Sequence, residues 1–454
     1  MSELPYSFLQ SVSACPGFDE EAFVKAHQEV SPVSIRLNPF KATNLDVELN
    51  DPVGWNAAGF YLAIRPNFTH DLLFQAGCYY VQEAGSMFIG HALKSCVNLE
   101  EDLSVFDVCA SPGGKSTLLN SLLTKESLLV ANEVVKTRSE VLAQNLAKWG
   151  TGNVIVTNND PTAYSEINNA FDVILVDAPC SGSGLFRKQH DAVDEWSPDN
   201  VNLCSQRQKR ILAEIMQSLK PGGTLLYSTC SYSRSENEDI ADWLVQEYAV
   251  VPVRIPLEES WGIVETKSEK QQAYGYRFYP DKTRSEGFFC AVFRKPGESD
   301  HSIATSGKKS RQEHIVVLKP KEKEPFRDWI ADVDAHELVK FKEDYLLTNA
   351  SAIQFVSRYP HLYLKKLGTT IGSLVRNDLI PHQDLAWSIY RSPAVQSIDC
   401  SAEEGLKFMK KELQTIGGEK GWNLICYKGF GLGWIKNLGN RINNYLPNEF
   451  RILK

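Results

Sequence analysis

Two apolar runs of this chain each lead into a cysteine. Residues 171–178 come just before Cys180, and residues 223–228 come just before Cys230. Short apolar runs that are rich in β-branched residues and bounded by Gly, Pro or Ser are typical of strands buried in a parallel sheet. Because ligands of an open α/β sheet bind at the carboxyl ends of its strands, the pattern predicts two thiols that face one pocket.

A third run of this kind opens onto a glycine-rich turn. Residues 104–108 lead into residues 109–115, where two glycines let the backbone approach a ligand closely before a helix begins. The next apolar run ends at Glu133, about 20 residues beyond the turn, where an acidic side chain can bind ribose hydroxyls. Asp160 ends a further run and is placed to meet the edge of an adenine ring. The sequence therefore predicts a nucleotide-type cofactor site beside a cysteine nucleophile.

The glycine turn also allows a different interpretation. Gly114-Lys115-Ser116 matches the end of the phosphate-binding loop Gly-x-x-x-x-Gly-Lys-[Ser/Thr], and residues 173–177 resemble a magnesium-binding Walker B strand. That loop requires a glycine at the position of Cys109. An NTPase also gives no reason for a cysteine at the ends of two neighbouring strands. A P-loop NTPase is therefore the alternative enzyme class.

Strand-like and helix-like segments alternate over residues 93–297, which predicts a doubly wound, Rossmann-like sheet. Upstream, residues 20–28 have a helical pattern, residues 33–39 have a strand pattern, and residues 79–93 predict an apolar helix. We therefore expect an α/β protein with a small α+β N-terminal domain and a C-terminal extension. The expected boundaries are 1–92 for the N-terminal flanking domain, 93–297 for the catalytic domain, 298–325 for a linker, 326–388 for the first part of the C-terminal domain, and 389–454 for its end.

The composition restricts the function further. No apolar run reaches the roughly 18 residues that a membrane span needs, and the first residues lack the pattern of a signal peptide. The ten cysteines include no Cys-x-x-Cys pair, which argues against a zinc ribbon or a thioredoxin-type motif, and we expect no metal site. Several cysteines lie in apolar runs, as reduced core cysteines do. We therefore expect a cytoplasmic monomer that binds no membrane.

Charge is distributed unevenly along the chain. The formal net charge is −8, but residues 301–454 carry 23 basic against 17 acidic side chains. A mildly basic C-terminal region can present a basic groove to a nucleic acid, although such a surplus is also ordinary for a solvated surface. If RNA binds there, a chain without residues 326–454 should lose RNA affinity and keep cofactor binding.

Several of these segments resemble the motifs of one enzyme family. Residues 107–115 resemble motif I of S-adenosylmethionine-dependent RNA cytosine-5 methyltransferases of the RsmB/RsmF (Sun) type. Residues 177–184 resemble motif IV of that family, and residues 228–238 resemble its motif VI. Residues 34–39 and 81–87 are similar to its N-terminal signatures.

The resemblance covers residues 1–297 and extends more loosely to the C-terminal region. Residues 368–372 and 429–450 are similar to the C-terminal extension of the RsmF branch, which methylates small-subunit rRNA. The resemblance implies a Rossmann-like methyltransferase domain, a PUA-like RNA-binding end over residues 389–454, and 16S rRNA as the partner. A non-catalytic RNA-binding ribosome assembly factor that keeps this fold is a further alternative.

The resemblance also implies how the two thiols work. Carbon 5 of cytosine is a poor nucleophile, so a thiolate must first add to carbon 6 of the ring. By this resemblance Cys230 is the nucleophile, and Asp177 hydrogen-bonds the base near its ring nitrogen. Cys180 would assist the release of the methylated product. The target cytosine must be unpaired or flipped out, because stacking in a helix hides carbon 6.

The implied cofactor is S-adenosyl-L-methionine. Its expected contacts are Cys109, Ala110, Ser111, Pro112, Gly113, Gly114, Lys115, Glu133, Arg138, Asp160 and Asp177. Three of these residues could instead serve the fold alone, since Glu133 and Asp160 could cap helices and Arg138 could form an ordinary surface pair. Lys188 could contact RNA phosphate or be solvated.

Overall fold

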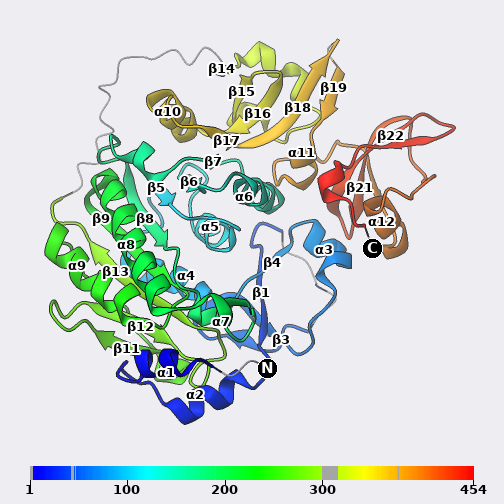
Figure 1. The fold of residues 1–454 in the computed structure, drawn as a ribbon. Helices are drawn as coiled ribbons and strands as arrows, with labels where there is room; N and C mark the ends of the chain where they lie inside the picture. Colours follow the sequence, from blue (N-terminus) through cyan, green and yellow to red (C-terminus); the bar gives the residue numbers. More distant parts are fainter. Residues whose placement is uncertain are drawn as a thin grey trace.

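A central sheet of ten strands organises the structure (Figure 1). The computed structural model describes residues 4–41, 45, 48–189, 191–298, 315–376 and 378–453. The sheet runs in the order β11-β12-β13-β9-β8-β5-β6-β7-β17, with β10 paired to β13. Its parallel strands are β5 (Ser104–Asp107), β6 (Leu128–Asn132), β7 (Val154–Thr157), β8 (Phe171–Asp177) and β9 (Leu219–Thr229). Its antiparallel strands are β10 (Val251–Pro252), β11 (Val264–Lys267), β12 (Tyr274–Phe278), β13 (Phe288–Arg294) and β17 (Leu364–Leu367).

Helices cover both faces of this sheet. They are α4 (Phe88–Cys96), α5 (Gly114–Asn120), α6 (Lys136–Trp149), α7 (Asp191–Glu195), α8 (Pro198–Ile215) and α9 (Glu238–Tyr248), with 3₁₀ turns η3 (Pro161–Tyr164), η4 (Ser183–Leu185), η5 (Met216–Ser218), η6 (Arg234–Glu236) and η7 (Glu259–Trp261). Along β8, Val173 and Leu175 belong to one buried cluster. The intervening Ile174 and Val176 belong to another, so successive side chains enter opposite faces.

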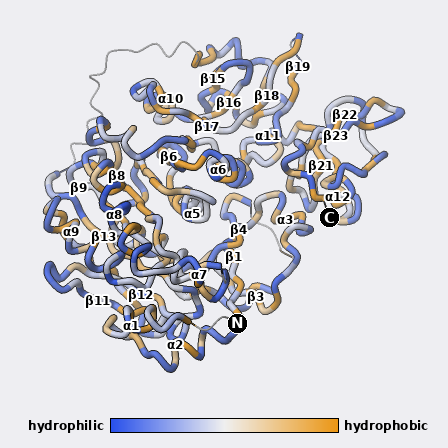
Figure 2. Tube along the Cα trace, viewed as in Figure 1, coloured by the Kyte–Doolittle hydropathy of each residue, from blue (hydrophilic) through white to orange (hydrophobic). Residues whose placement is uncertain are grey.

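Figure 2 shows that β6 and β8 are hydrophobic along most of their length, as expected for strands covered on both faces. The prediction of a doubly wound, Rossmann-like domain is therefore confirmed. Among the helices of the described residues, none combines the length and the apolar character that a membrane span needs.

The N-terminal domain combines short helices with a four-stranded antiparallel sheet in the order β2-β3-β1-β4. Its elements are α1 (Tyr6–Val12), α2 (Glu20–His27), β1 (Val33–Leu37), β2 (Pro52–Val53), β3 (Asn56–Leu62), η1 (Phe68–His70), α3 (Leu72–Gln75), β4 (Tyr79–Val81) and η2 (Gly85–Met87). The predicted helix over residues 20–28 and the predicted strand from residue 33 are confirmed.

The predicted helix over residues 79–93 is wrong in its first half. Tyr79 to Val81 form strand β4 on the edge of the N-terminal sheet, and the α-helix begins only at Phe88. The carboxylate of Glu83 accepts hydrogen bonds from the backbone N–H groups of Gly85 and Ser86, each at 2.9 Å, and thereby starts the helical turn η2. The β-branched and aromatic character of the first residues decides their conformation through pairing with β1, which a helical apolar pattern does not reveal.

The C-terminal region contains two more sheets. The first, in the order β14-β15-β16-β18-β19, lies at the top of Figure 1, and the second is β20-β21-β22-β23. The strands are β14 (Ile315–Val317), β15 (Glu337–Phe341), β16 (Asp344–Thr348), β18 (Thr369–Val375), β19 (Asp378–Pro381), β20 (Ser397–Asp399), β21 (Gly421–Tyr427), β22 (Phe430–Asn437) and β23 (Ile442–Asn444). The helices are η8 (Pro320–Phe326), η9 (Val333–Ala335), α10 (Ala350–Arg358), α11 (Gln383–Trp387), α12 (Ala402–Met409) and η10 (Asn448–Phe450).

The predicted linker over residues 298–325 falls in two parts. Residues 299–314 lie outside the described residues. The remainder of the segment holds strand β14 and most of the turn η8, so it contributes regular structure to the C-terminal region.

The C-terminal region also shares the core of the central domain. Strand β17 pairs with the edge strand β7, and Phe355, Leu362 and Leu367 belong to the same buried cluster as Ile155 and Phe171. Removing residues 326–454 would therefore uncover this cluster and leave β7 without its neighbour. The expectation that such a truncation keeps cofactor binding intact does not fit this packing, because the region is not a separable appendage.

Candidate active site

The candidate site lies where the order of strands in the sheet reverses. Strand β5 lies between β6 and β8, so the chain proceeds from β5 in one direction across the sheet and later in the other. In open α/β sheets, ligands bind at this switch point, outside the carboxyl ends of the strands. Since β5, β8 and β9 are parallel neighbours, the segments that follow them leave the sheet at one edge. The glycine turn and both cysteines lie in those segments.

The structure brings the two predicted thiols into contact. The Sγ atoms of Cys180 and Cys230 are 3.0 Å apart, and both residues are half-buried free cysteines. The hydrogen bond to Cys230, together with burial, raises the pKa of the Cys180 thiol well above its usual value. The two thiols therefore share one hydrogen bond, in which either sulfur can be the donor.

Glu236 joins the two cysteine loops. Its buried carboxylate accepts hydrogen bonds from the backbone N–H of Ser181 at 2.7 Å, from the hydroxyl of Ser181 at 2.6 Å and from the hydroxyl of Ser231 at 2.5 Å. Burial raises its pKa, and these hydrogen bonds oppose that rise. Because each serine follows one of the cysteines, a single carboxylate fixes both thiol-bearing loops. Sequence reasoning did not include Glu236, although an acidic residue just beyond Cys230 in a serine-rich segment was a visible signal.

Asp177 lies between the glycine turn and β9. Its Oδ2 accepts a hydrogen bond from Lys115 Nζ at 2.8 Å, and its Oδ1 accepts one from Ser228 Oγ at 2.7 Å. Burial lowers the pKa of Lys115, but the charge of Asp177 and the hydrogen bond to it outweigh burial and raise that pKa. Lys115 therefore stays protonated and orients Asp177 at the end of β8.

The glycine turn has the backbone shape that close approach to a ligand requires. Gly113 has φ of +112°, a conformation that residues with a Cβ rarely adopt, and helix α5 begins at the next residue. Arg36 of the N-terminal domain supports the turn through hydrogen bonds. Its Nη2 donates to the Gly114 carbonyl at 3.3 Å and to Thr117 Oγ1 at 2.6 Å. The N-terminal domain thus helps to shape the predicted cofactor site.

The remaining residues of the turn are held by β6 and α6. Ala110 donates its backbone N–H to the Asn132 carbonyl of β6 at 2.9 Å, and the Pro112 carbonyl accepts a hydrogen bond from Asn145 of α6 at 2.8 Å. Ser111 exchanges two hydrogen bonds with Arg138, at 3.0 and 3.1 Å. Cys109 is half-buried at the start of the turn.

Asp107, at the end of β5, is a buried acceptor that sequence reasoning did not include. Its Oδ2 accepts a hydrogen bond from Ser116 Oγ at 2.6 Å, whereas its Oδ1 has no hydrogen-bond partner within the described residues. Burial raises the pKa of Asp107 to about 7. A buried, unpaired acceptor beneath a glycine turn is suited to the ammonium group of an amino-acid ligand. The signal in the sequence was an acidic residue that ends a buried strand just before the turn.

Ser116 bears on the NTPase interpretation. In a P-loop the hydroxyl at this position binds magnesium, but here it is fully buried and donates to Asp107. Within the described residues, His, Cys, Asp and Glu side chains form no group of three or more that could hold a metal ion. The Ser116 hydroxyl is therefore already engaged inside the protein.

Glu133 and Asp160, the other two acidic residues predicted to contact the cofactor, differ in burial and in their hydrogen-bond partners. Glu133 is buried, accepts the Val135 backbone N–H at 2.9 Å and lies 3.6 Å from Arg138. Asp160 is half-buried, caps the 3₁₀ turn η3 through Thr162 and pairs with Arg210 at 3.3 Å. Asp160 therefore acts as a cap in this structure, and Glu133 is the more enclosed of the two candidates.

Comparisons with known proteins place every part of this architecture in one set of relatives. A family model described as 16S rRNA methyltransferase RsmB/F matches residues 94–294. A model of the N-terminal domain of 16S rRNA methyltransferase RsmF matches residues 4–84, and a model of the methyltransferase RsmF PUA domain matches residues 395–452. The three matches follow one another along the chain without overlap.

Individual relatives agree over nearly the full length. The chain is 27% identical to ribosomal RNA small subunit methyltransferase F of Shewanella baltica and 28% identical to that of Shewanella oneidensis, covering 99% of this chain and 97% of each relative. Among solved structures, a methyltransferase homologue from Pyrococcus horikoshii is similar at a TM-score of 0.51 and 28% identity, over 64% of this chain and 100% of the other. NSun6 from the same organism, solved with SFG, shares the fold at a TM-score of 0.54 and 18% identity, over 65% and 99% of the two chains.

Proposed function

This chain belongs to the RsmB/F family of 16S rRNA methyltransferases, and from this premise we propose that it methylates carbon 5 of a cytosine in small-subunit rRNA through a covalent adduct with Cys230. The names of its relatives support the coarser statement, that it is a small-subunit rRNA methyltransferase. The observation that carries the finer proposal is the 3.0 Å contact between the Cys180 and Cys230 sulfurs at the ends of two adjacent strands.

The cofactor is S-adenosyl-L-methionine, which supplies the methyl group from a sulfonium cation when bound. Residues 109–115 would hold its amino-acid part, with Asp107 as the unpaired acceptor for the ammonium group. Glu133 would accept hydrogen bonds from the ribose hydroxyls. The acceptors Asp107 and Glu133 thus suit the ammonium group and the ribose hydroxyls of a nucleoside that carries an amino acid.

Cys230 acts first on the substrate. Its thiolate adds to carbon 6 of cytosine, the carbon–sulfur bond forms, and carbon 5 becomes an enamine carbon nucleophilic enough to accept a methyl group. In the proposed mechanism the Cys180 thiol donates a hydrogen bond to the Cys230 sulfur, 3.0 Å away, during this step. Asp177 lies at the end of the neighbouring strand, within reach of a base held at this edge of the sheet.

Product release reverses the covalent step. A base removes the proton from carbon 5, the electron pair restores the double bond between carbons 5 and 6, and Cys230 leaves as a thiolate. The Cys180 S–H stabilises the departing sulfur through the same hydrogen bond. The two cysteines therefore have distinct roles even though they touch, and Cys180 matters most after methyl transfer.

The first test concerns the cofactor. Replacing Glu133 with alanine removes the acceptor for the ribose hydroxyls, and losing hydrogen bonds to a charged group costs about 1.5–3 kcal/mol. The affinity for S-adenosylmethionine should therefore fall about ten- to a hundredfold in calorimetry. Asp160→Ala, at the half-buried capping position, should change the affinity less. Unchanged affinity in Glu133→Ala would mean that the ribose lies elsewhere.

The second test identifies the product. Unmodified small-subunit rRNA is incubated with the protein and isotope-labelled S-adenosylmethionine, and the nucleosides are then analysed. All label should appear in 5-methylcytidine. Label in another nucleoside would contradict the proposed position, and an absence of label on both naked rRNA and assembled subunits would favour the non-catalytic assembly factor.

A further inference from the structure

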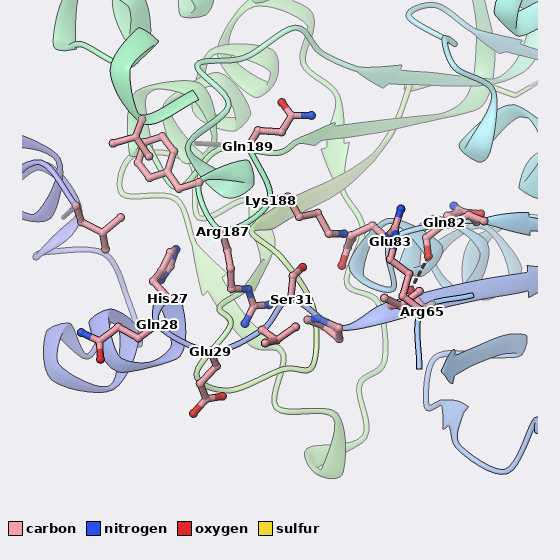
Figure 3. Close-up of a pocket in the computed structure, with 18 residues that line it drawn as sticks. His27, Gln28, Glu29, Ser31, Arg65, Gln82, Glu83, Arg187, Lys188 and Gln189 are labelled. Atoms are coloured by element: carbon pink, nitrogen blue, oxygen red, sulfur yellow. Dashed lines mark hydrogen bonds between the residues drawn. The ribbon is translucent and has the colours of Figure 1, made fainter. Parts of the chain in front are cut away.

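A pocket of about 700 Å³ opens between the N-terminal domain and the loop that follows Cys180 (Figure 3). One wall is residues 186–189, which follow the turn η4. The opposite wall is the connection between α2 and β1, together with Arg65 beyond β3 and Gln82 beyond β4. The volume lies within the range of about 300–1,000 Å³ that is typical of ligand pockets.

The pocket adjoins the candidate active site on two sides. The Gly184 N–H donates to the Cys230 carbonyl at 2.8 Å, so the wall formed by residues 186–189 starts at the backbone of the proposed nucleophile. Gln82 lies 3.7 Å from where a Cβ on Gly114 would be, so the floor of the pocket lies against the glycine turn. A ligand in the pocket would therefore be next to both the reacting base and the cofactor.

The wall is held in a fixed shape by a buried ion pair. Arg187 Nε lies 3.1 Å from Glu286 Oε2, and both side chains are almost fully buried. Arg187 also donates to the Ala26 carbonyl at 3.3 Å and to the Ser285 carbonyl at 2.9 Å. Its charge is thus neutralised within the protein, and it joins helix α2 to the loop after Cys180. The pocket is pre-formed and does not depend on Arg187 for binding a ligand.

Two other cations remain available at the pocket. Lys188 and Arg65 line it from different domains, both are exposed, and neither forms an ion pair within the described residues. The carboxylate of Glu83 is already occupied by three backbone N–H groups. Glu29 is thus the one acidic side chain that lines the pocket, within the described residues, without such partners. Lys188 and Arg65 are therefore the two side chains of the pocket proposed to meet an anionic ligand.

His27 and its neighbours add the features that a base requires. His27 hydrogen-bonds through Nδ1 to the Phe23 carbonyl at 2.8 Å, and burial lowers its pKa. The ring is therefore neutral near pH 7 and leaves Nε2 as a hydrogen-bond acceptor. Val30, Pro32 and Phe186 supply apolar surface in the same pocket. These features match those of a nucleotide. The cations suit its charged phosphate, the apolar surface suits the flat face of its base, and the neutral acceptor on His27 suits the polar edge of the base.

We propose that this pocket is a subsite for an unpaired nucleotide directly next to the target cytosine, with its phosphate bound by Lys188 and Arg65. The proposal rests on the proposed function, because it takes the substrate to be RNA that reaches Cys230. The N-terminal domain then binds the substrate directly, in addition to supporting the glycine turn through Arg36. The subsite holds the RNA strand on one side of the cytosine, so that the target base can leave its stack.

The test compares full-length variants in binding to unmodified small-subunit rRNA over a range of salt concentrations. Lys188→Ala, Arg65→Ala and the double variant each remove cations from the pocket, and Lys94→Ala removes an exposed cation from α4 that does not line it. Each lost phosphate contact lowers the slope of log affinity against log salt by about 0.7–0.9. The double variant removes both cations that hold this one phosphate, so its slope should fall by about 0.7–0.9 and its affinity at low salt by about tenfold. Lys94→Ala should match the unaltered protein.

A slope for the double variant equal to that of Lys94→Ala would overturn the proposal. The KM for rRNA should rise in the pocket variants while calorimetry shows unchanged affinity for S-adenosylmethionine, and a loss of cofactor affinity instead would mean that the pocket serves the fold or the cofactor. Methyl transfer by the unaltered protein is measured in the same preparation. If that protein transfers no methyl group, the proposed function fails, whereas the salt slopes still decide whether RNA occupies the pocket.

Discussion

Cys230→Ala is expected to abolish methyl transfer to rRNA. Without this thiol the proposed nucleophile is gone, and no sulfur is left at the end of β9 to add to carbon 6. Removing the nucleophile of a covalent mechanism slows turnover by at least about four orders of magnitude. Single-turnover assays with labelled S-adenosylmethionine measure the loss directly. No protein–RNA adduct should form.

A matched cysteine variant controls for the loss of a thiol as such. Cys204 is buried on α8, and its Sγ hydrogen-bonds to Asn200 Oδ1 at 3.7 Å, on a different element from either reactive sulfur. Cys204→Ala should keep turnover close to that of the unaltered protein, and Cys230→Ala should keep its affinity for S-adenosylmethionine. If Cys230→Ala retained more than about a hundredth of the activity, against the loss expected of a nucleophile, Cys230 would not be the nucleophile.

Cys180→Ala is expected to trap the enzyme on its substrate. The attack by Cys230 remains possible in this variant, although slower, because its sulfur loses an S–H donor at 3.0 Å. Departure of Cys230 after methylation loses the same donor and has no replacement for it, so the methylated adduct should accumulate. Denaturing electrophoresis of labelled rRNA with the variant should show a band of protein joined to RNA, and turnover should fall to a single event per enzyme.

The opposite pattern would reassign the cysteines. An adduct with Cys230→Ala and none with Cys180→Ala would make Cys180 the nucleophile, as in enzymes where the thiol after proline attacks. An adduct with neither variant would contradict the release role of Cys180.

Much of this site follows from strand ends that are visible in the sequence. The runs before Cys180 and Cys230 are apolar, which predicts buried parallel strands whose ends can face one pocket, and β8 and β9 are parallel partners in the structure. Because parallel strands end at one edge, two distant thiols could be placed together without knowledge of the packing. The glycine turn was recognisable for the same reason, since only a strand followed by glycines and a helix offers that backbone.

The parts that escaped the sequence depend on tertiary contacts. Glu236 hydrogen-bonds to the loops that follow Cys180 and Cys230. These two cysteines lie 50 positions apart in the chain. The local pattern around Glu236, a carboxylate among serines, is equally typical of a surface turn. Strand β17 was missed because its residues Leu364–Leu367 include two lysines and gain their strand conformation from the free edge of β7. Pairing at a sheet edge is decided by the partner strand more than by propensity.

Asp160 shows a second limit of the sequence, because its position fits two different roles. Its place at the end of an apolar run predicts a cofactor contact, which stays a prediction, and its carboxylate also caps the 3₁₀ turn η3 and pairs with Arg210. A strand-end acid and a helix-capping acid look alike in a sequence, because both stand just before a helical segment.

The central claim is that Cys230 forms the bond to a cytosine that then becomes methylated. Its most direct test is to isolate the covalent complex of Cys180→Ala with small-subunit rRNA, digest both components and identify the joined peptide and nucleotide by mass spectrometry. The account predicts a peptide containing Cys230 that carries a cytosine nucleotide with one added methyl group. A nucleotide attached to any other residue, or a base other than cytosine on Cys230, would contradict it.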